Sequence, residues 1–137
     1  MRAYFDSSAL VKRYVEESGS DAVQEILDRT DELAIGIIGP PEVISVFVRK
    51  RRERILTPDH YQVAKSALIE EIADMTVCGI TSSVVETAIA LIETIPLRTL
   101  DALHVACAAD WNADVFVSAD KRQMEAARNL GLQVIGV

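Results

Sequence analysis

The sequence predicts one α/β domain in which a parallel five-stranded sheet carries helices on both faces. Short apolar runs typical of buried strands alternate with longer stretches whose apolar residues recur at helical spacing. Half of the residues are hydrophobic but only 5% are aromatic, which is typical of a sheet covered by helices. No linker, internal repeat or low-complexity tract interrupts the 137 residues, so we expect a single domain over residues 1–137.

Five strands are expected from the short apolar runs. The first run ends directly at Asp6, and helices separate each run from the next, singly or in pairs. Such connections favour parallel pairing, because a crossover helix returns the chain to the same end of the sheet. The expected strands are residues 2–5, 33–37, 75–80, 114–118 and 132–136.

Helices are expected between these strands, and several have recognisable start signals. Ser7 and Ser8 offer an N-cap for the first helix, and Ser20 begins the second. Pro40 and Pro41 suit the first turn of a third helix, which continues into the basic stretch 49–54. Further starts are expected at Thr57, at Thr81 or Ser82, and at Thr99, giving helices 58–74, 83–95, 100–112 and a last one at 120–130.

The net charge of −7 argues against a protein whose whole surface binds nucleic acid. It does not exclude a nuclease, because carboxylates that hold a divalent cation contribute to the negative sum and the bound ion reverses the local charge. Cys78 and Cys107 lie in apolar stretches and are expected to be buried, reduced thiols.

The chain carries no signal for a membrane. No segment reaches the roughly 18 continuous apolar residues that span a bilayer. The N-terminal segment is charged throughout and lacks the pattern of a signal peptide. We therefore expect a soluble, cytoplasmic protein.

Four acidic residues are candidates for one site. Asp6 and Asp120 follow expected strands, and Glu42 lies in the first turn of the helix after the second strand. Ligands of an open parallel sheet bind at the carboxyl edge of the strands, where these three residues would meet. Asp101 opens a helix, so its convergence with the others depends on tertiary packing. A helix-capping role is an alternative for Asp101 and Asp120.

Clustered carboxylates point to a hard cation. They would raise one another's pKa, and a divalent ion relieves that repulsion. Oxygen ligands suit Mg²⁺ or Mn²⁺, and the sequence has no cluster of His and Cys residues that would suit zinc. Such ions polarise a phosphodiester and activate water.

Three segments, at the expected separations, resemble the motifs of PIN-domain ribonucleases, and in particular of the VapC-type toxins of toxin–antitoxin pairs. The opening segment YFDSSALVKRYVEE holds Asp6, RTLDALHVACA holds Asp101, and FVSADKRQMEAARNLGLQVI holds Asp120 two positions after Ser118. Glu42, within PPEVISVFVRK, matches the second acidic position, although Pro40 and Pro41 depart from the usual pattern there.

The resemblance implies a three-layer α/β/α sandwich and Mg²⁺- or Mn²⁺-dependent endonucleolytic cleavage of RNA. It implies that Asp6 and Asp101 are the principal metal ligands and that Glu42 and Asp120 complete the catalytic site. Ser7 and Ser118 are then expected to support these acids by hydrogen bonds. It also implies a small antitoxin partner and a homodimer, for which the apolar helix 83–95 offers a surface.

Basic residues near the acids are candidates for RNA contact. The third expected helix continues into a dense run of basic residues, which are Arg49, Lys50, Arg51, Arg52 and Arg54. Two further basic residues, Lys121 and Arg122, follow Asp120. A solvated helix end explains the run equally well. His104 lies one helical turn from Asp101 and is expected to pack or to support an acid, with metal binding or proton transfer as the alternatives.

Two other classes of function are alternatives to the nuclease. The first is a PIN-fold module that binds RNA or protein with little catalytic turnover, and the presence of all four acids argues against it. A receiver domain needs paired acids after the first strand, and a haloacid-dehalogenase-type phosphatase needs a second Asp two residues after the first. Asp6 is followed by Ser7 and Ser8, so neither of these patterns is present.

Overall fold

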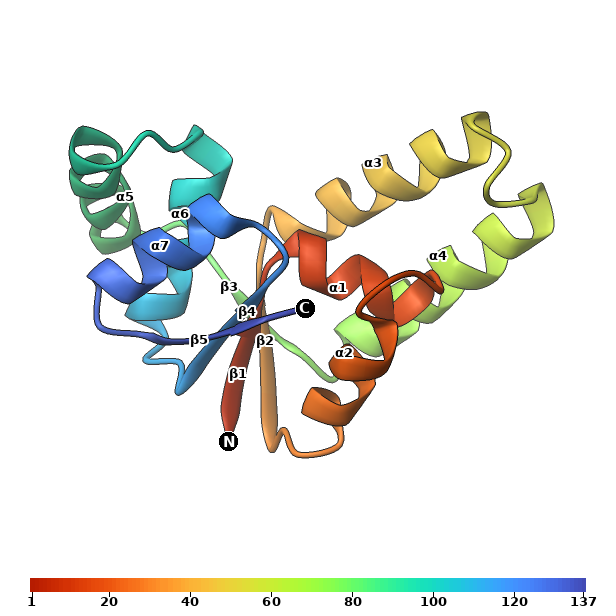
Figure 1. Cartoon of the computed structure of the whole chain (residues 1–137), viewed down its shortest axis with the longest axis horizontal. Helices are drawn as coiled ribbons and strands as arrows, with labels where there is room; N and C mark the ends of the chain where they lie inside the picture. Colours follow the sequence, from red (N-terminus) through yellow and green to blue (C-terminus); the bar gives the residue numbers. More distant parts are fainter.

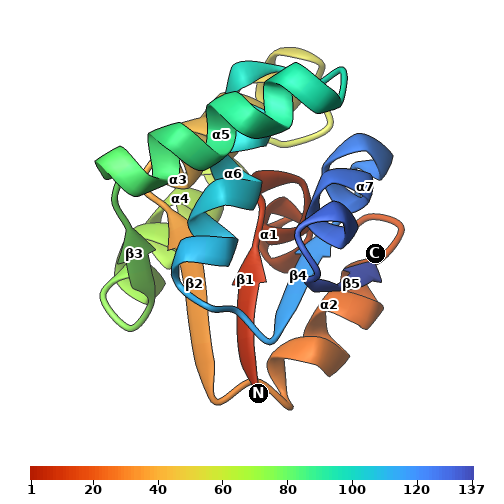
Figure 2. The same cartoon turned by 90° about the vertical axis from the view of Figure 1, so that its left-hand side faces the viewer.

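Five parallel strands form the central sheet of the computed structural model, which describes residues 1–137 (Figure 1). The order across the sheet is β3-β2-β1-β4-β5, and Figure 2 shows β1 between β2 and β4. Ala3 of β1 pairs with Leu33 on one side and with Val115 on the other. The strands are β1 (Arg2–Phe5), β2 (Glu32–Gly36), β3 (Thr76–Cys78), β4 (Val115–Ser118) and β5 (Gln133–Gly136).

Seven helices cover the two faces of the sheet, which gives the expected three layers (Figure 1). One face is covered by α1 (Ser7–Tyr14), α2 (Ser20–Leu27), α3 (Gly39–Arg52) and α4 (Pro58–Ile72). The other is covered by α5 (Ser82–Thr94), α6 (Thr99–Asp110) and α7 (Lys121–Asn129). No helix is both long and apolar enough to cross a membrane.

Two apolar cores lie on opposite sides of the sheet because side chains alternate along each strand. Ala3 and Phe5 of β1 point into the core beneath α1 to α4. Tyr4, between them, points into the core beneath α5 to α7 and stacks on Phe116 of β4. All of these side chains are fully buried, so the register of the central strands is fixed by packing on both faces.

The helix starts follow the expected signals at most positions. Thr57 caps α4 and Thr81 caps α5, each through its hydroxyl oxygen. Two expectations were wrong. The cap of α1 is Asp6, because its carboxylate accepts the Ala9 amide, and Thr99 is already the first residue of α6.

The topology brings the acid-bearing segments together. β1 lies at the centre of the sheet, and the chain leaves it toward β2 on one side before returning to β4 on the other. The crevice at such a reversal is where open α/β sheets place their ligands. The segments that follow β1, β2 and β4 all begin at this edge.

Candidate functional site

Asp6 lies at the carboxyl end of β1 and is completely buried. Its carboxylate accepts a hydrogen bond of 2.9 Å from the Ala9 amide and one of 2.7 Å from the Ser118 hydroxyl. The Ser8 hydroxyl lies 2.8 Å from each carboxylate oxygen. Burial raises the pKa of Asp6, and the hydrogen bonds from Ser118, Ala9 and Ser8 oppose that rise. The carboxylate is thus fixed in a desolvated position where a nearby cation would stabilise its charge.

Ser118 connects the end of β4 to the end of β1. Besides donating to Asp6, its Oγ accepts the amide of Asp120 at 2.9 Å. Oδ1 of Asp120 in turn accepts the amides of Arg122 and Gln123, at 2.8 and 3.1 Å, and thereby caps α7. The capping role considered from the sequence is therefore correct for Asp120. The same residue also lines the cleft at this edge of the sheet.

Asp101 lies in the first turn of α6 and is only 6% exposed. Its Oδ2 is 3.1 Å from Nε of Arg98, and its Oδ1 accepts a hydrogen bond of 2.9 Å from Nε2 of Gln123. The other polar atom of Gln123, Oε1, is buried and has no hydrogen-bond partner. A buried oxygen of this kind is costly to leave unpaired. It marks a place beside Asp101 where a cation or a donor group would be stabilised.

Arg98 and Gln123 were both missed by reasoning from the sequence. Arg98 precedes Asp101 by three residues, a spacing that brings side chains together at a helix start, so it could have been found. Gln123 shares the buried face of α7 with Ala126 and Ala127. A polar residue at an otherwise apolar helix position was the available signal.

Glu42 lies in the first turn of α3, as the Pro40-Pro41 signal predicted. Its Oε1 accepts the Ser7 hydroxyl at 2.7 Å and lies 2.5 Å from Nε2 of His104. Partial burial raises the pKa of Glu42, but the hydrogen bonds from His104 and Ser7 and the charge of Arg98 outweigh it, so the pKa lies below its usual value. Glu42 is therefore an anchored carboxylate that stays ionised at neutral pH.

His104 supports Glu42 from inside the core. It is 1% exposed, and its Nδ1 lies 3.0 Å from the hydroxyl of Tyr4. Because a carboxylate only accepts, Nε2 of His104 donates to Glu42, and Nδ1 on the other side of the ring bonds the Tyr4 hydroxyl. Gly36 leaves room for this arrangement, since a Cβ there would stand 2.6 Å from the Tyr4 oxygen. Of the roles considered from the sequence, support of an acid fits this geometry.

Three of the four acids act electrostatically on the guanidinium of Arg98. Its side chain is 80% exposed, and the hydrogen bond and charge of Asp101 raise its pKa, helped by the charges of Asp120 and Glu42. The cleft around it is lined by Arg98, Asp101, Ala119, Asp120, Lys121 and Arg122. Asp6 is connected to this group through Ser118, whose hydroxyl bonds both Asp6 and the amide of Asp120. The four predicted acids therefore share one edge of the sheet.

The donors suit a hard divalent cation in chemical type, since they are oxygens and an amide carbonyl adds to them. They do not surround a single point in this conformation, because no group of three or more acidic, His or Cys side chains is close enough to hold an ion. Each carboxylate instead accepts hydrogen bonds from protein donors, and Arg98 is the donor to Oδ2 of Asp101. Arg98 is exposed enough to move aside, and the unpaired Oε1 of Gln123 is a further oxygen on a side chain that already bonds Asp101. The residues thus fit such an ion in their ligand type and in their location at one edge of the sheet.

The expected basic residues divide between two clefts and open surface. Lys121 and Arg122 line the cleft of Asp101. Arg49 and Lys50 line a second cleft between α1 and α3. The rest of the run lies outside both clefts: Arg51 stacks on the ring of Tyr61 at 4.5 Å, and Arg52 and Arg54 are exposed.

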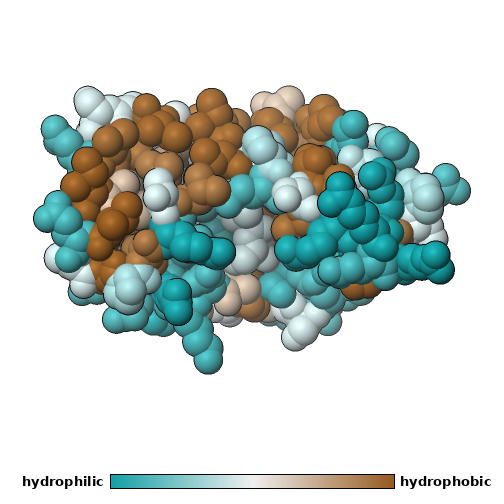
Figure 3. Space-filling view, turned by 90° about the horizontal axis from the view of Figure 1, so that it is seen from above, coloured by the Kyte–Doolittle hydropathy of each residue, from teal (hydrophilic) through white to brown (hydrophobic).

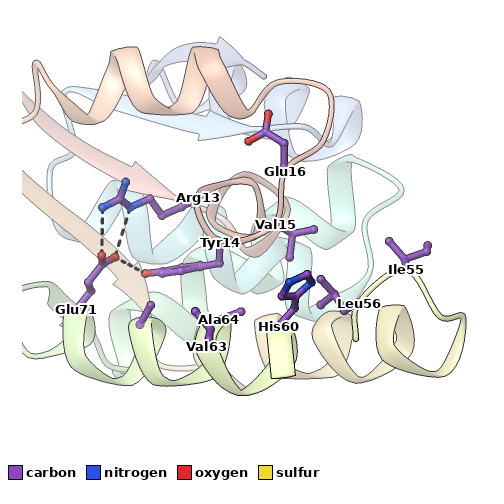
Figure 4. A pocket seen from close by; sticks show the side chains of 11 residues that line it. Arg13, Tyr14, Val15, Glu16, Ile55, Leu56, His60, Val63, Ala64 and Glu71 are labelled. Atoms are coloured by element: carbon purple, nitrogen blue, oxygen red, sulfur yellow. Dashed lines mark hydrogen bonds and ion pairs between the residues drawn. The ribbon is translucent and has the colours of Figure 1, made fainter. Parts of the chain in front are cut away.

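A separate, mainly apolar pocket lies between α1 and α4, away from these acids (Figure 4). Glu71 closes one end of it by accepting bonds from Arg13 at 3.1 Å and from the Tyr14 hydroxyl at 2.8 Å. His60 and Glu16 line its rim, and none of the four predicted acids contributes to it. This pocket therefore forms no part of the candidate site.

Comparison with known proteins agrees with the motifs. A family model described as PIN domain matches residues 3–129. Ribonuclease VapC46 of Mycobacterium tuberculosis is 34% identical over 134 residues, which are 96% of this chain and 95% of that protein.

Two solved structures of low sequence identity share the fold. VapC20 of Mycobacterium tuberculosis, a toxin that cleaves the sarcin-ricin loop, superposes with a TM-score of 0.70 at 12% identity, over 90% of this chain and 94% of that one. VapBC2 of Rickettsia felis, bound to a DNA fragment from its promoter, gives 0.71 at 13% identity, over 100% and 99%. The predicted α/β/α sandwich is confirmed.

Proposed function

The chain belongs to the PIN domain family, and from this premise we propose that it is an endoribonuclease that hydrolyses RNA phosphodiesters with the help of Mg²⁺ or Mn²⁺. One observation carries the proposal. Four acids, which cap α1 and α7 and lie in the first turns of α3 and α6, share one edge of the sheet, in a chain 34% identical to a ribonuclease. A hard cation and a phosphodiester are the ligands that such an edge attracts.

The side chains divide the work of hydrolysis between them. Asp6, Glu42, Asp101 and Asp120 would hold the ion, which when bound offsets phosphodiester charge and helps to activate water. Ser118 and Gln123 orient Asp6 and Asp101. Glu42, kept ionised by His104 and Ser7, accepts a hydrogen bond from the attacking water and orients it.

Basic side chains of the same cleft position the substrate. Arg98, Lys121 and Arg122 surround Asp101 and Asp120, where they would pair with phosphate oxygens. Catalysis then rests on positioning and charge stabilisation, and no protein nucleophile is needed.

Cleavage of purified RNA by the chain alone tests this proposal. We expect cleavage with Mg²⁺ or Mn²⁺, no cleavage in EDTA, and a loss of at least about 100-fold in Asp6→Asn and Asp101→Asn. Asp110→Asn is the matched control, because Asp110 is an exposed acid at the far end of the same helix as Asp101. Equal activity of Asp101→Asn and Asp110→Asn would contradict the assignment. RNA binding without cleavage under every metal condition would favour a PIN-fold binding module.

We further propose that the chain is the toxin of a type II toxin–antitoxin pair that acts in the cytoplasm. Its relative by sequence is named as a VapC ribonuclease, and one structural neighbour is a VapBC pair. A small antitoxin that covers the acidic cleft would hold the enzyme inactive. Co-purification from native cells, followed by sequencing of cleaved RNA ends, tests both the partner and the target.

A homodimer through α5 belongs to the same proposal. Val85, Ile89 and Ile92 of α5 are 41%, 52% and 40% exposed, and Figure 3 shows apolar side chains gathered over the end of the molecule where Figure 1 places α5. An apolar patch of this kind marks an interface. Ile89→Glu should give a monomer in light scattering. Ile69→Glu, at a site 58% exposed on α4, should leave the dimer intact, and a dimer in both variants would exclude this surface.

A further inference from the structure

A cleft between α1 and α3 opens beside the candidate site and is lined by several charged side chains. Lys12 and Glu17 lie on its α1 side, and Arg49 and Lys50 lie on its α3 side. The remaining lining residues are Ser8, Val11, Val46 and Ala119. Three cations and one acid give this surface a positive balance on a chain whose net charge is −7.

The cleft adjoins the acidic site at Ala119. This exposed residue lines both the cleft between α1 and α3 and the cleft of Asp101 and Asp120. Its amide donates a hydrogen bond of 2.9 Å to Ser8, whose hydroxyl also contacts Asp6. A strand lying over Ala119 would therefore have the acids on one side and Lys12, Arg49 and Lys50 on the other.

Two of the three cations are held in place. Glu17 bridges them, with Oε1 3.4 Å from Nζ of Lys12 and Oε2 3.2 Å from Nζ of Lys50. Nζ of Lys12 also donates to the Ser18 carbonyl at 2.6 Å. The lysine side chains are only 11% and 16% exposed, so they form part of the wall of the cleft. Arg49 is exposed at the mouth of the cleft.

We propose that this cleft binds the sugar-phosphate backbone of the RNA strand on one side of the scissile bond, with Arg49 as the phosphate contact at its mouth and Lys12 and Lys50 as positive charges in its wall. The inference rests on the proposed ribonuclease function. Of the basic run 49–54, it assigns only Arg49 and Lys50 to the RNA-binding surface. No aromatic side chain lines the cleft, so bases cannot stack there. The cleft therefore recognises the charge and shape of the RNA backbone and does not discriminate between bases. Glu17 limits the affinity, because it neutralises part of the charge that phosphates would pair with.

The test is binding of a fluorescein-labelled single-stranded RNA by anisotropy in EDTA, with RNA integrity checked on a gel. Arg49→Ala should weaken binding by about three- to tenfold and lower the salt slope by about 0.7, the value for one phosphate contact on a single strand. Arg52→Ala is the matched control, since Arg52 is an exposed arginine one turn further along α3 and outside the cleft. Equal weakening by the two variants would overturn the proposal.

A variant that gains affinity excludes misfolding as an explanation. Glu17→Gln should tighten RNA binding by about threefold or more at low salt, because both lysines lose their competing carboxylate. Glu16→Gln removes the same charge from the neighbouring residue, which lines the apolar pocket between α1 and α4, and should change binding little (Figure 4). Identical effects of the two would show that net charge alone matters and would reject the cleft.

These binding experiments test the cleft independently of the proposed ribonuclease activity. Wild-type protein that cleaves RNA while Arg49→Ala and Glu17→Gln bind like wild type would reject the cleft and keep the ribonuclease. Protein that never cleaves RNA, yet shows these differences in affinity, would keep the cleft and reject the enzyme.

Discussion

The hydroxyl of Ser118 donates a hydrogen bond of 2.7 Å to the carboxylate of Asp6, across 112 positions of the chain. The bond joins the carboxyl ends of β4 and β1, two neighbouring strands at the centre of the sheet. Ser118 also accepts the amide of Asp120, so one buried hydroxyl sets the positions of two acids. Partners of this kind fix the direction in which a metal ligand points.

Removing this hydroxyl should weaken the site while keeping the fold. We expect Ser118→Ala to lose about 10- to 100-fold in metal affinity or in RNA cleavage, the usual cost of losing such a partner. Titration with Mn²⁺ and initial cleavage rates measure the two effects. Ser118→Thr keeps the hydroxyl and should recover most of the loss, and an equally inactive threonine variant would argue for a packing effect instead.

Neutralising Asp6 should stabilise the metal-free protein. Burial raises the pKa of Asp6, because the charged carboxylate is less stable in the folded core than in the unfolded chain, where water surrounds it. Asp6→Asn in EDTA should therefore melt roughly 3 °C or more above wild type. The gap should shrink as the pH falls through the raised pKa, because the folded wild-type protein then takes up the proton more readily than the unfolded chain.

Calorimetry of Asp6→Asn beside Asp74→Asn, an exposed acid after α4, measures this effect. The Asp74 variant should melt like wild type. A drop of several degrees in Asp6→Asn would instead mean that Asp6 acts mainly as the cap of α1.

The sequence correctly predicted the positions of those site residues whose placement depends on neighbouring residues in the chain. An acid directly after an apolar strand placed Asp6 at the sheet edge, and the Pro40-Pro41 pair placed Glu42 in the first turn of α3. The cap of α1 was assigned to Ser7 or Ser8 because a hydroxyl is as good a cap as a carboxylate by local rules. The structure gives that bond to Asp6, whose orientation is set by Ser118 from another strand.

The contacts that sequence reasoning missed depend on packing between distant elements. Gln123 reaches Asp101 only because α7 packs against α6, and His104 reaches Glu42 because both α6 and α3 pack against β2. No spacing in the chain encodes either distance. Each acid has protein partners, some from this packing and some from its own segment of the chain, and no three of the carboxylates stand around one point.

The thiol of Cys107 should make stability fall at alkaline pH. Burial, with a contribution from Cys78, raises the pKa of the Cys107 thiol to about 11 from an ordinary value of 9.0. Below pH 9 both states keep the proton, whereas between about pH 9 and 11 the unfolded chain releases it and the folded chain does not, so unfolding is favoured. Urea unfolding at pH 8 and pH 10 should show wild type losing on the order of 1 kcal/mol more than Cys107→Ala. Parallel losses in the two proteins would assign the alkaline transition to another group.

Arg98 should compete with a divalent ion for Asp101. Its Nε lies 3.1 Å from Oδ2 of Asp101, and the guanidinium supplies positive charge where an ion would otherwise supply it. Arg98→Gln should therefore bind Mn²⁺ several-fold more tightly than wild type in a paramagnetic-resonance titration without RNA. Arg122→Gln removes the same charge from the same cleft, where Arg122 contacts Asp120 through its backbone amide alone, and should tighten binding less. If Arg98→Gln gains no more affinity than Arg122→Gln, the ion does not displace this arginine and Asp101 is not its principal ligand.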